Sequence, residues 1–155
     1  MDRRPKTLPL ELALAVLHSA FSRWTVHCMS AAGLPELTPL DVLVLHHVHH
    51  RGRGKHLSDI CFVLNVEDTH VVNYSLKKLQ GLGVVRSDRK KKEVAYATTE
   101  VGRSLVERYR EIRERCLVDA LASDRELNGK VGDQAPLLRA LSSVFDRAAR
   151  TVAML

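Results

Sequence analysis

The chain of 155 residues is long enough for one domain with a buried core, and it carries a formal charge of +6. It has no run of eighteen apolar residues and no closely spaced pair of cysteines, so we expect no membrane span and a reducing, cytoplasmic location. The positive excess lies between residues 51 and 92, where ten Lys or Arg face four Asp or Glu (10 − 4 = +6). The remainder is neutral, so this part of the chain is the one expected to bind phosphates.

A long first helix is predicted over residues 10–32, after a loose arm of nine residues, and Gly33 and Pro35 end it. We expect residues 10–36 to form dimer contacts, because the helix has a broad apolar face that needs a partner surface. Packing within the chain's own core explains Phe21 and Trp24 equally well. The apolar face consists of Leu12, Val16, Leu17, Ala20, Phe21, Trp24 and Cys28.

Thr38 and Pro39 predict the start of a second helix, since threonine caps helices and proline fits the first helical position. Histidines follow near its end, and His46 and His50 share a face as zinc ligands would. The alternative is a helix C-terminus at which histidines face the negative end of the helix dipole. We favour the alternative and expect no metal, because no Cys, Asp or Glu close by completes a site. The cluster consists of His46, His47, His49, His50 and His56.

Two short amphipathic segments predict a helix-turn-helix. Residues 57–64 and 68–82 each have apolar side chains three or four apart, and Asp68 can cap the second helix. A helix, a short turn and a second helix is the arrangement that places the second helix in a DNA major groove.

A charged hairpin is expected next, with strands over residues 84–86 and 94–97 and a loop over 87–93; residues 55–56 can add a short strand. A solvated basic loop is the alternative, but the position after a helix-turn-helix favours contact with nucleic acid. Thr98 or Thr99 then caps a long helix to about residue 122.

Breaks at Asn128–Gly129, Gly132 and Pro136 are expected to precede a terminal helix with an apolar stripe.

Residues 79–85, the charged hairpin and residues 97–102 together resemble the MarR family of bacterial transcription regulators. The resemblance implies one domain over residues 1–155. It places a winged helix over 38–98 and dimerisation helices over 10–36 and 99–155, in a mainly α fold with a small β-hairpin wing. It also implies a homodimer, a palindromic operator and often a small-molecule effector. The hairpin is richer in lysine than the usual family wing, which commonly carries further arginines.

Three sets of residues follow from the periodicity and the resemblance. The recognition helix should present Thr69, His70, Asn73, Tyr74, Lys77 and Lys78 to DNA, with Asn73 and Thr69 at base edges and both lysines at phosphates. The wing should contact the DNA backbone or minor groove through Arg86, Arg89, Lys90, Lys91 and Lys92. The dimer interface should include Leu12, Val16, Leu141, Phe145 and Val152.

No Gly-rich phosphate loop, nucleophile motif or metal-ligand set appears, so we expect neither an enzyme nor a cofactor. Some relatives in the resembled family sense oxidants through a cysteine in the first helix, and Cys28 lies near the end of that helix. Such a role needs an accessible, thiolate-stabilising setting. The predicted function is a sequence-specific regulator that binds double-stranded DNA. The alternatives are a winged-helix module for protein assembly without a specific DNA site and, third, an RNA-binding module.

Overall fold

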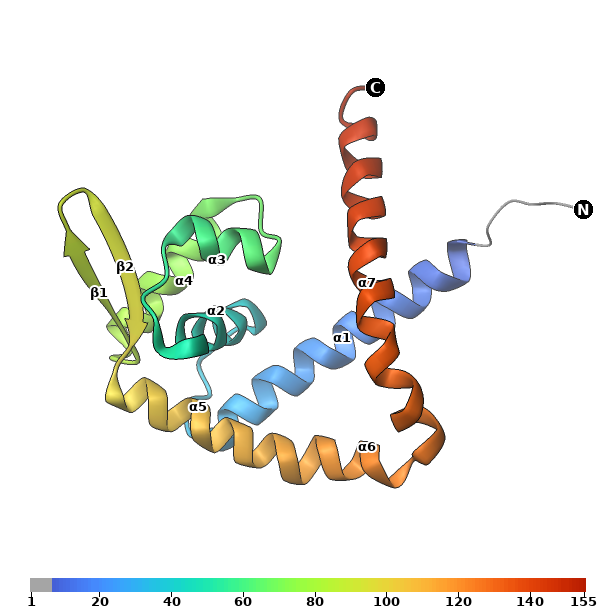
Figure 1. Cartoon of the computed structure of the whole chain (residues 1–155), viewed down its shortest axis with the longest axis horizontal. Coiled ribbons are helices and arrows are strands. Elements are labelled where there is room, and N and C mark those ends of the chain that lie inside the picture. Colours follow the sequence, from blue (N-terminus) through green and yellow to red (C-terminus); the bar gives the residue numbers. More distant parts are fainter. Residues whose placement is uncertain (1–6) are drawn as a thin grey trace, which may run out of the picture. The chain divides into compact units, whose positions relative to one another are not determined.

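The computed structural model describes residues 7–155, which are mainly helical with one two-stranded antiparallel sheet (Figure 1). The chain forms two compact units, and the first ends at Ile112 while the second covers Arg113–Leu155. The predicted fold class, a mainly α winged helix with flanking helices, is confirmed. None of the helices within residues 7–155 is long and apolar enough to cross a membrane.

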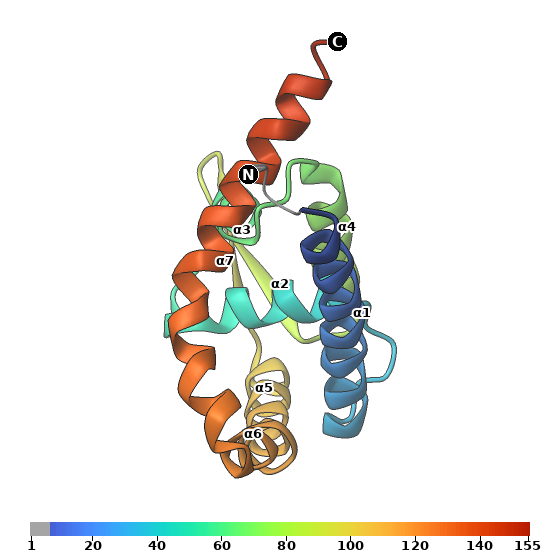
Figure 2. The same cartoon turned by 90° about the vertical axis from the view of Figure 1, so that its right-hand side faces the viewer.

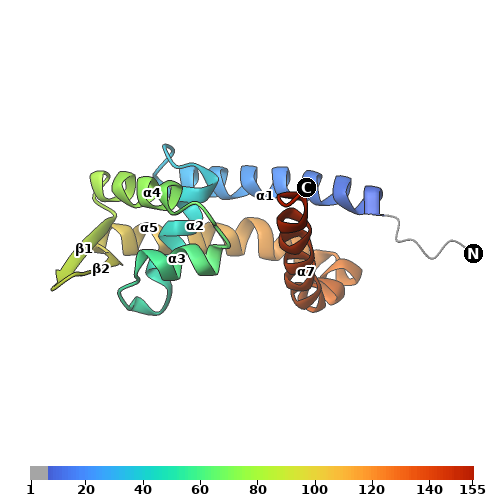
Figure 3. The ribbon, with the colours of Figure 1, turned by 90° about the horizontal axis from the view of Figure 1, so that it is seen from above.

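The first unit holds the winged helix. Its elements are α1 (Thr7–Ala32), α2 (Pro39–His49), the short 3-10 helix η1 (His50–Gly52), α3 (Leu57–Leu64), α4 (Thr69–Gly81), β1 (Val85–Lys90), β2 (Glu93–Thr98) and most of α5 (Glu100–Arg113). Figure 2 shows α2 lying across α1, with α3 and α4 to one side of α2 and α5 to the other. The β1–β2 hairpin projects from this group of helices (Figure 3).

The core of the first unit collects side chains from all of its main helices. Met29 of α1, Leu45 of α2, Ile60 of α3 and Leu76 of α4 are each fully buried. Burying one such side chain stabilises the fold by about 1.5–3 kcal/mol. The apolar positions spaced three or four apart on α4 are all buried, and the opposite, free face of the helix is exposed.

Helix α1 begins three residues earlier than predicted, at Thr7. Pro9 falls in its first turn, where a backbone without an N–H group is tolerated. The rest of the predicted arm, residues 1–6, lies outside the described residues. The predicted start of α2 is confirmed: Thr38 Oγ1 accepts from the Asp41 backbone N at 3.3 Å, and Asp41 Oδ2 accepts from the Thr38 N at 2.9 Å. This reciprocal capping box satisfies two backbone donors.

The hairpin is longer than predicted. Its strands pair from Val85 with Thr98 to Lys90 with Glu93, so only Lys91 and Lys92 connect them, and the predicted seven-residue loop is wrong. Residues 86–90 of β1 are polar and exposed, so this part of the strand shows no apolar alternation that would have predicted it. The predicted extra strand is confirmed as a bridge, since the backbones of Lys55 and Tyr96 exchange two hydrogen bonds of 2.8 Å.

The start of α5 fits closely against the strand entry. Thr99 is the cap, since its Oγ1 accepts from the Gly102 N at 3.1 Å and donates to the Gly83 carbonyl at 2.6 Å. A Cβ on Gly102 would lie 2.0 Å from the Val84 carbonyl oxygen. Only glycine permits this approach, which gives a physical reason for the glycine at the end of the family-like 97–102 segment.

The second unit contains the end of α5, the π-helical turn η2 (Glu114–Val118), α6 (Asp119–Ser123) and α7 (Arg125–Val152). The predicted break at residues 128–136 is wrong, because α7 runs through it. Asp124 caps α7 by accepting from the Leu127 N at 3.0 Å, and the helix continues past Gly129 and Gly132 with Pro136 inside it. No residue of α7 is buried.

Candidate nucleic-acid interface

The free face of α4 carries most of the residues predicted to contact DNA. Asp68 caps the helix by accepting from the His70 N at 2.9 Å. Beyond the cap, Asn73 is partly exposed and Tyr74 is 73% exposed. The exposed set is completed by Thr69, His70 and Lys77. If α4 lies in a major groove, these side chains can form hydrogen bonds with the edges of the bases.

The hairpin supplies a basic tip. Arg89, Lys90, Lys91 and Lys92 are all exposed, and the last two form the turn between β1 and β2. Arg86 is different, because its guanidinium pairs with the carboxylate of Asp88 on the same strand. Both partners of that pair are exposed, so the pair contributes little to stability.

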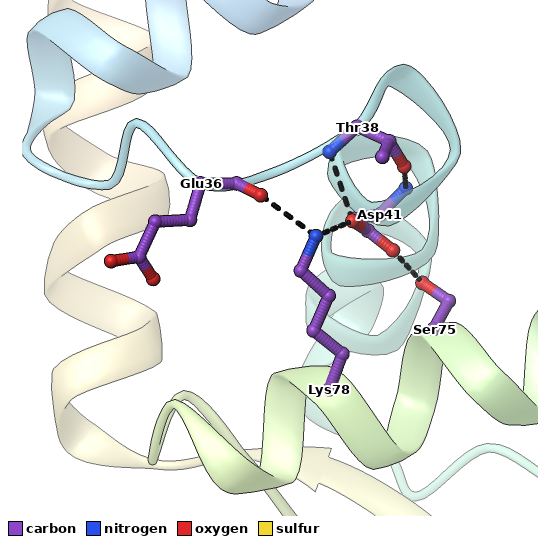
Figure 4. Close-up of polar contacts among 5 residues, drawn as sticks. All are labelled: Glu36, Thr38, Asp41, Ser75 and Lys78. Atoms are coloured by element: carbon purple, nitrogen blue, oxygen red, sulfur yellow. Dashed lines mark hydrogen bonds and ion pairs between the residues drawn. The ribbon is translucent and has the colours of Figure 1, made fainter.

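A buried polar network joins α4 to α2 (Figure 4). Asp41 of α2 is 3% exposed, and its Oδ1 accepts from Ser75 Oγ at 2.6 Å while its Oδ2 accepts from Lys78 Nζ at 2.7 Å. Lys78 Nζ also donates to the Glu36 carbonyl at 2.7 Å. A carboxylate this deep is tolerated because several donors satisfy it.

This network changes the assignment of Lys78. Lys78 was predicted to contact a phosphate, but its ammonium group is bound within the protein, so we leave it out of the proposed DNA-contacting set. Ser75 and Asp41 were not singled out from the sequence. The sequence does contain a signal for the capping role of Asp41, since an acidic residue three positions after Thr38 indicates a capping box. No local pattern links Asp41 to residues 75 and 78.

The network also sets the ionisation of Asp41. Burial raises the pKa of this carboxyl group, but the hydrogen bonds from Lys78, Ser75 and Thr38 together outweigh burial, and the pKa lies below its ordinary value of 3.8. The carboxylate therefore stabilises the folded state above the unfolded-state pKa, and this contribution is lost as the pH falls through the lower, folded-state pKa.

Asp41→Asn should lower the free energy of unfolding by about 2 kcal/mol at pH 7, because it removes a charged acceptor from a buried network. The difference between the two proteins should stay constant at neutral pH and shrink below the ordinary aspartate pKa. Denaturant unfolding of both proteins over a pH series measures it. A difference that is constant down to pH 2 would show that the charge of Asp41 contributes nothing.

Two histidines of the predicted cluster contact different backbone carbonyls. His46 Nδ1 lies 2.8 Å from the Val42 carbonyl oxygen, and its ring packs edge-on against Tyr109. His56 Nδ1 lies 3.0 Å from the Val94 carbonyl oxygen. Burial lowers the pKa of His46, which favours the neutral ring. Over residues 7–155 no three His, Cys, Asp or Glu side chains gather as a metal-ligand set.

Cys28 is only 2% exposed, and its thiol contacts the Tyr109 carbonyl at 3.6 Å, so the accessible setting that oxidant sensing needs is missing.

Residues 37–102 match the family model described as the winged helix DNA-binding domain. This part of the chain is a winged helix of the DNA-binding type. The match spans α2 through the start of α5 and therefore includes α4, the wing and the Asp41–Lys78 network. No curated protein matches the sequence. A DNA-binding domain agrees with the expectation that the chain is not an enzyme.

Solved structures extend the likeness beyond the winged helix. A MarR-family transcriptional regulator from Rhodococcus sp. RHA1 is 14% identical with a TM-score of 0.66, covering 89% of this chain and 95% of its own. CouR, a transcriptional repressor solved with a 23-mer DNA duplex, is 20% identical with a TM-score of 0.65, and the likeness covers 93% of this chain and 99% of CouR. BpsR from Bordetella bronchiseptica is 18% identical with a TM-score of 0.62, and the likeness covers 91% of this chain and 98% of BpsR. These structures confirm the MarR-like fold predicted from residues 79–102.

Proposed function

We propose that this winged-helix protein is a transcriptional regulator that binds a palindromic DNA operator as a homodimer. The observation that carries the proposal is the free face of α4, which presents Asn73 and its polar neighbours on a matched DNA-binding domain beside a basic hairpin tip. In this proposal α4 reads base edges in the major groove, and the wing contacts phosphates or the minor groove. CouR, which has a similar fold, was solved on DNA, and this supports the same use here.

The DNA-contacting residues we propose form two sets. On α4 they are Thr69, His70, Asn73, Tyr74 and Lys77, and on the wing they are Arg86, Arg89, Lys90, Lys91 and Lys92. Arg86 can exchange its exposed pairing with Asp88 for a phosphate at little cost, since exposed ion pairs are weak. Lys78 is excluded.

A homodimer is supported by apolar surface outside the winged helix. On α1, Leu12 and Val16 are 66% and 61% exposed, and on α7, Phe145 and Val152 are 43% and 66% exposed. Leu141 is half-buried. Apolar stripes of this extent on long helices need a covering surface, and a second copy of the chain supplies it.

Sedimentation should therefore show a dimer at micromolar concentration, and Phe145→Asp or Leu12→Asp should shift it toward the monomer because each places a charge in the apolar contact. Val63→Asp is the matched control, since Val63 is 58% exposed on α3, within the winged helix and outside both proposed dimerisation segments. A monomeric wild-type chain at micromolar concentration would remove the dimer from the proposal.

Control by a small-molecule effector and a cytoplasmic location complete the proposal. BpsR, which shares the fold, is described as having its DNA binding regulated by 6-hydroxynicotinic acid. The cytoplasmic location agrees with three cysteines that form no disulfide with one another.

Selection of duplexes from a random-sequence pool by the full-length protein tests the proposal. We expect enrichment of one inverted repeat and protection of both half-sites in a footprint, because a two-fold dimer binds two equivalent half-sites. Equal recovery of all sequences would instead favour an assembly module, and preferential retention of single-stranded or duplex RNA would favour an RNA-binding module.

A further inference from the structure

Lys78 lies on the recognition helix α4 but points away from the proposed DNA face. Its Nζ is 2.7 Å from Asp41 Oδ2 at the start of α2 and 2.7 Å from the carbonyl oxygen of Glu36 (Figure 4). Its side chain is 28% exposed, whereas that of Asp41 is 5% exposed. The lysine therefore spans from α4 to the segment that precedes α2.

The contact has two anchors on α4. Ser75 donates to the other carboxylate oxygen of Asp41 at 2.6 Å, one helical turn before Lys78. Asp41 itself is fixed by the capping box with Thr38. Two donors one turn apart, held by one rigid carboxylate, define both the rotation of α4 about its axis and its position along that axis.

The segment between α1 and α2 is held from a second side. Arg108 of α5 donates from Nε to the carbonyl oxygen of Ala32, the last residue of α1, at 2.8 Å. Four residues later the carbonyl of Glu36 accepts from Lys78. The same short segment thus contacts α5 at one end and α4 at the other.

We propose that Lys78 is a positioning residue that sets the register of α4 on DNA through Asp41 and Glu36, and that it makes no phosphate contact. The inference rests on the proposed function. The network holds the side chains of the α4 DNA face at the orientation that base reading requires. Base reading depends on placement far more sharply than phosphate attraction does, so a loosened α4 loses sequence preference first.

The test compares Asp41→Asn, the double variant Asp41→Asn/Lys78→Met, and Lys77→Met as a matched exposed lysine. The double variant leaves no buried charge unpaired, so it remains testable if a single change unfolds the protein. Each full-length protein is checked for folding by thermal melting. It is then titrated against a duplex selected by the wild-type protein and against a scrambled duplex, at several salt concentrations.

We expect Asp41→Asn and the double variant to lower the operator-to-scrambled affinity ratio by about three- to thirtyfold, with an unchanged salt slope. Lys77→Met should weaken both duplexes alike and lower the slope by about 0.9, as one lost phosphate contact does. If the double variant lowers the salt slope as Lys77→Met does, Lys78 contacts phosphate and the inference is wrong. If Asp41→Asn leaves the operator-to-scrambled ratio unchanged, the network does not set the register of α4, and the inference is wrong for that reason. A wild-type protein with no preference would overturn the proposed function and this inference together.

Discussion

Gly102→Ala is expected to lower the free energy of unfolding by about 3 kcal/mol, at the upper end of the cost of overpacking. The added Cβ would lie 2.0 Å from the Val84 carbonyl oxygen and 2.9 Å from the Val84 carbonyl carbon. Both are backbone atoms, so no side-chain rotation relieves the clash. The entry of β1 and the first turn of α5 must separate, which also breaks the hydrogen bond from Thr99 N to the Val84 carbonyl.

Gly81→Ala is the matched control for this prediction. Gly81 ends α4, and no atom lies within 4 Å of the Cβ position there. Alanine at this position should be neutral or stabilising by up to about 1 kcal/mol, since it favours the helix. Denaturant unfolding of both variants and the wild type gives the comparison. Equal stabilities for the two variants would mean that α5 does not approach Val84 as closely as the structure has it.

Replacing Lys90, Lys91 and Lys92 together by alanine is expected to weaken duplex binding by about a hundredfold to a thousandfold at 0.1 M salt. Each phosphate contact contributes roughly 0.9 to the slope of log K against log salt, so three lost contacts remove about 2.7. The three side chains are exposed at the wing tip and support no core, so folding should be unaffected. Operator and scrambled duplex should be weakened by similar factors, because phosphates look alike at every step.

The control for the wing variant removes the same charge elsewhere. Arg125, Lys130 and Arg139 are exposed on α7, outside the winged helix. Their replacement by alanine should change the slope little, since the condensed counterions are released only where lysines or arginines lie at the DNA. If the two triple variants lower the slope equally, the wing acts only through net charge.

The winged helix was predictable because its local signals agree. Apolar spacing located α3 and α4, and Asp68 and Thr38 marked the helix starts. The hairpin length was missed for a physical reason: residues 86–90 of β1 are exposed and are held by backbone pairing with β2, so their side chains follow no apolar pattern.

Long-range polar contacts were the other feature that the sequence did not predict. Lys78 was predicted to contact a phosphate because it follows Lys77 on the recognition helix, and an exposed lysine there would be available to the DNA backbone. Its partner Asp41 lies 37 residues earlier, and the contact arises only when α2 packs on α4. Spacing within one segment contains no information about a partner of that kind.

The most direct test of base reading by α4 is the affinity of Asn73→Ala for the selected operator and for a scrambled duplex, at two salt concentrations. Asn73 is partly exposed between Thr69 and Lys77, four residues from each, and borders the buried stripe that contains Leu76. We predict a loss of about 1–3 kcal/mol on the operator, little change on the scrambled duplex and an unchanged salt slope. An equal loss on both duplexes would contradict base reading and leave α4 as an electrostatic anchor only.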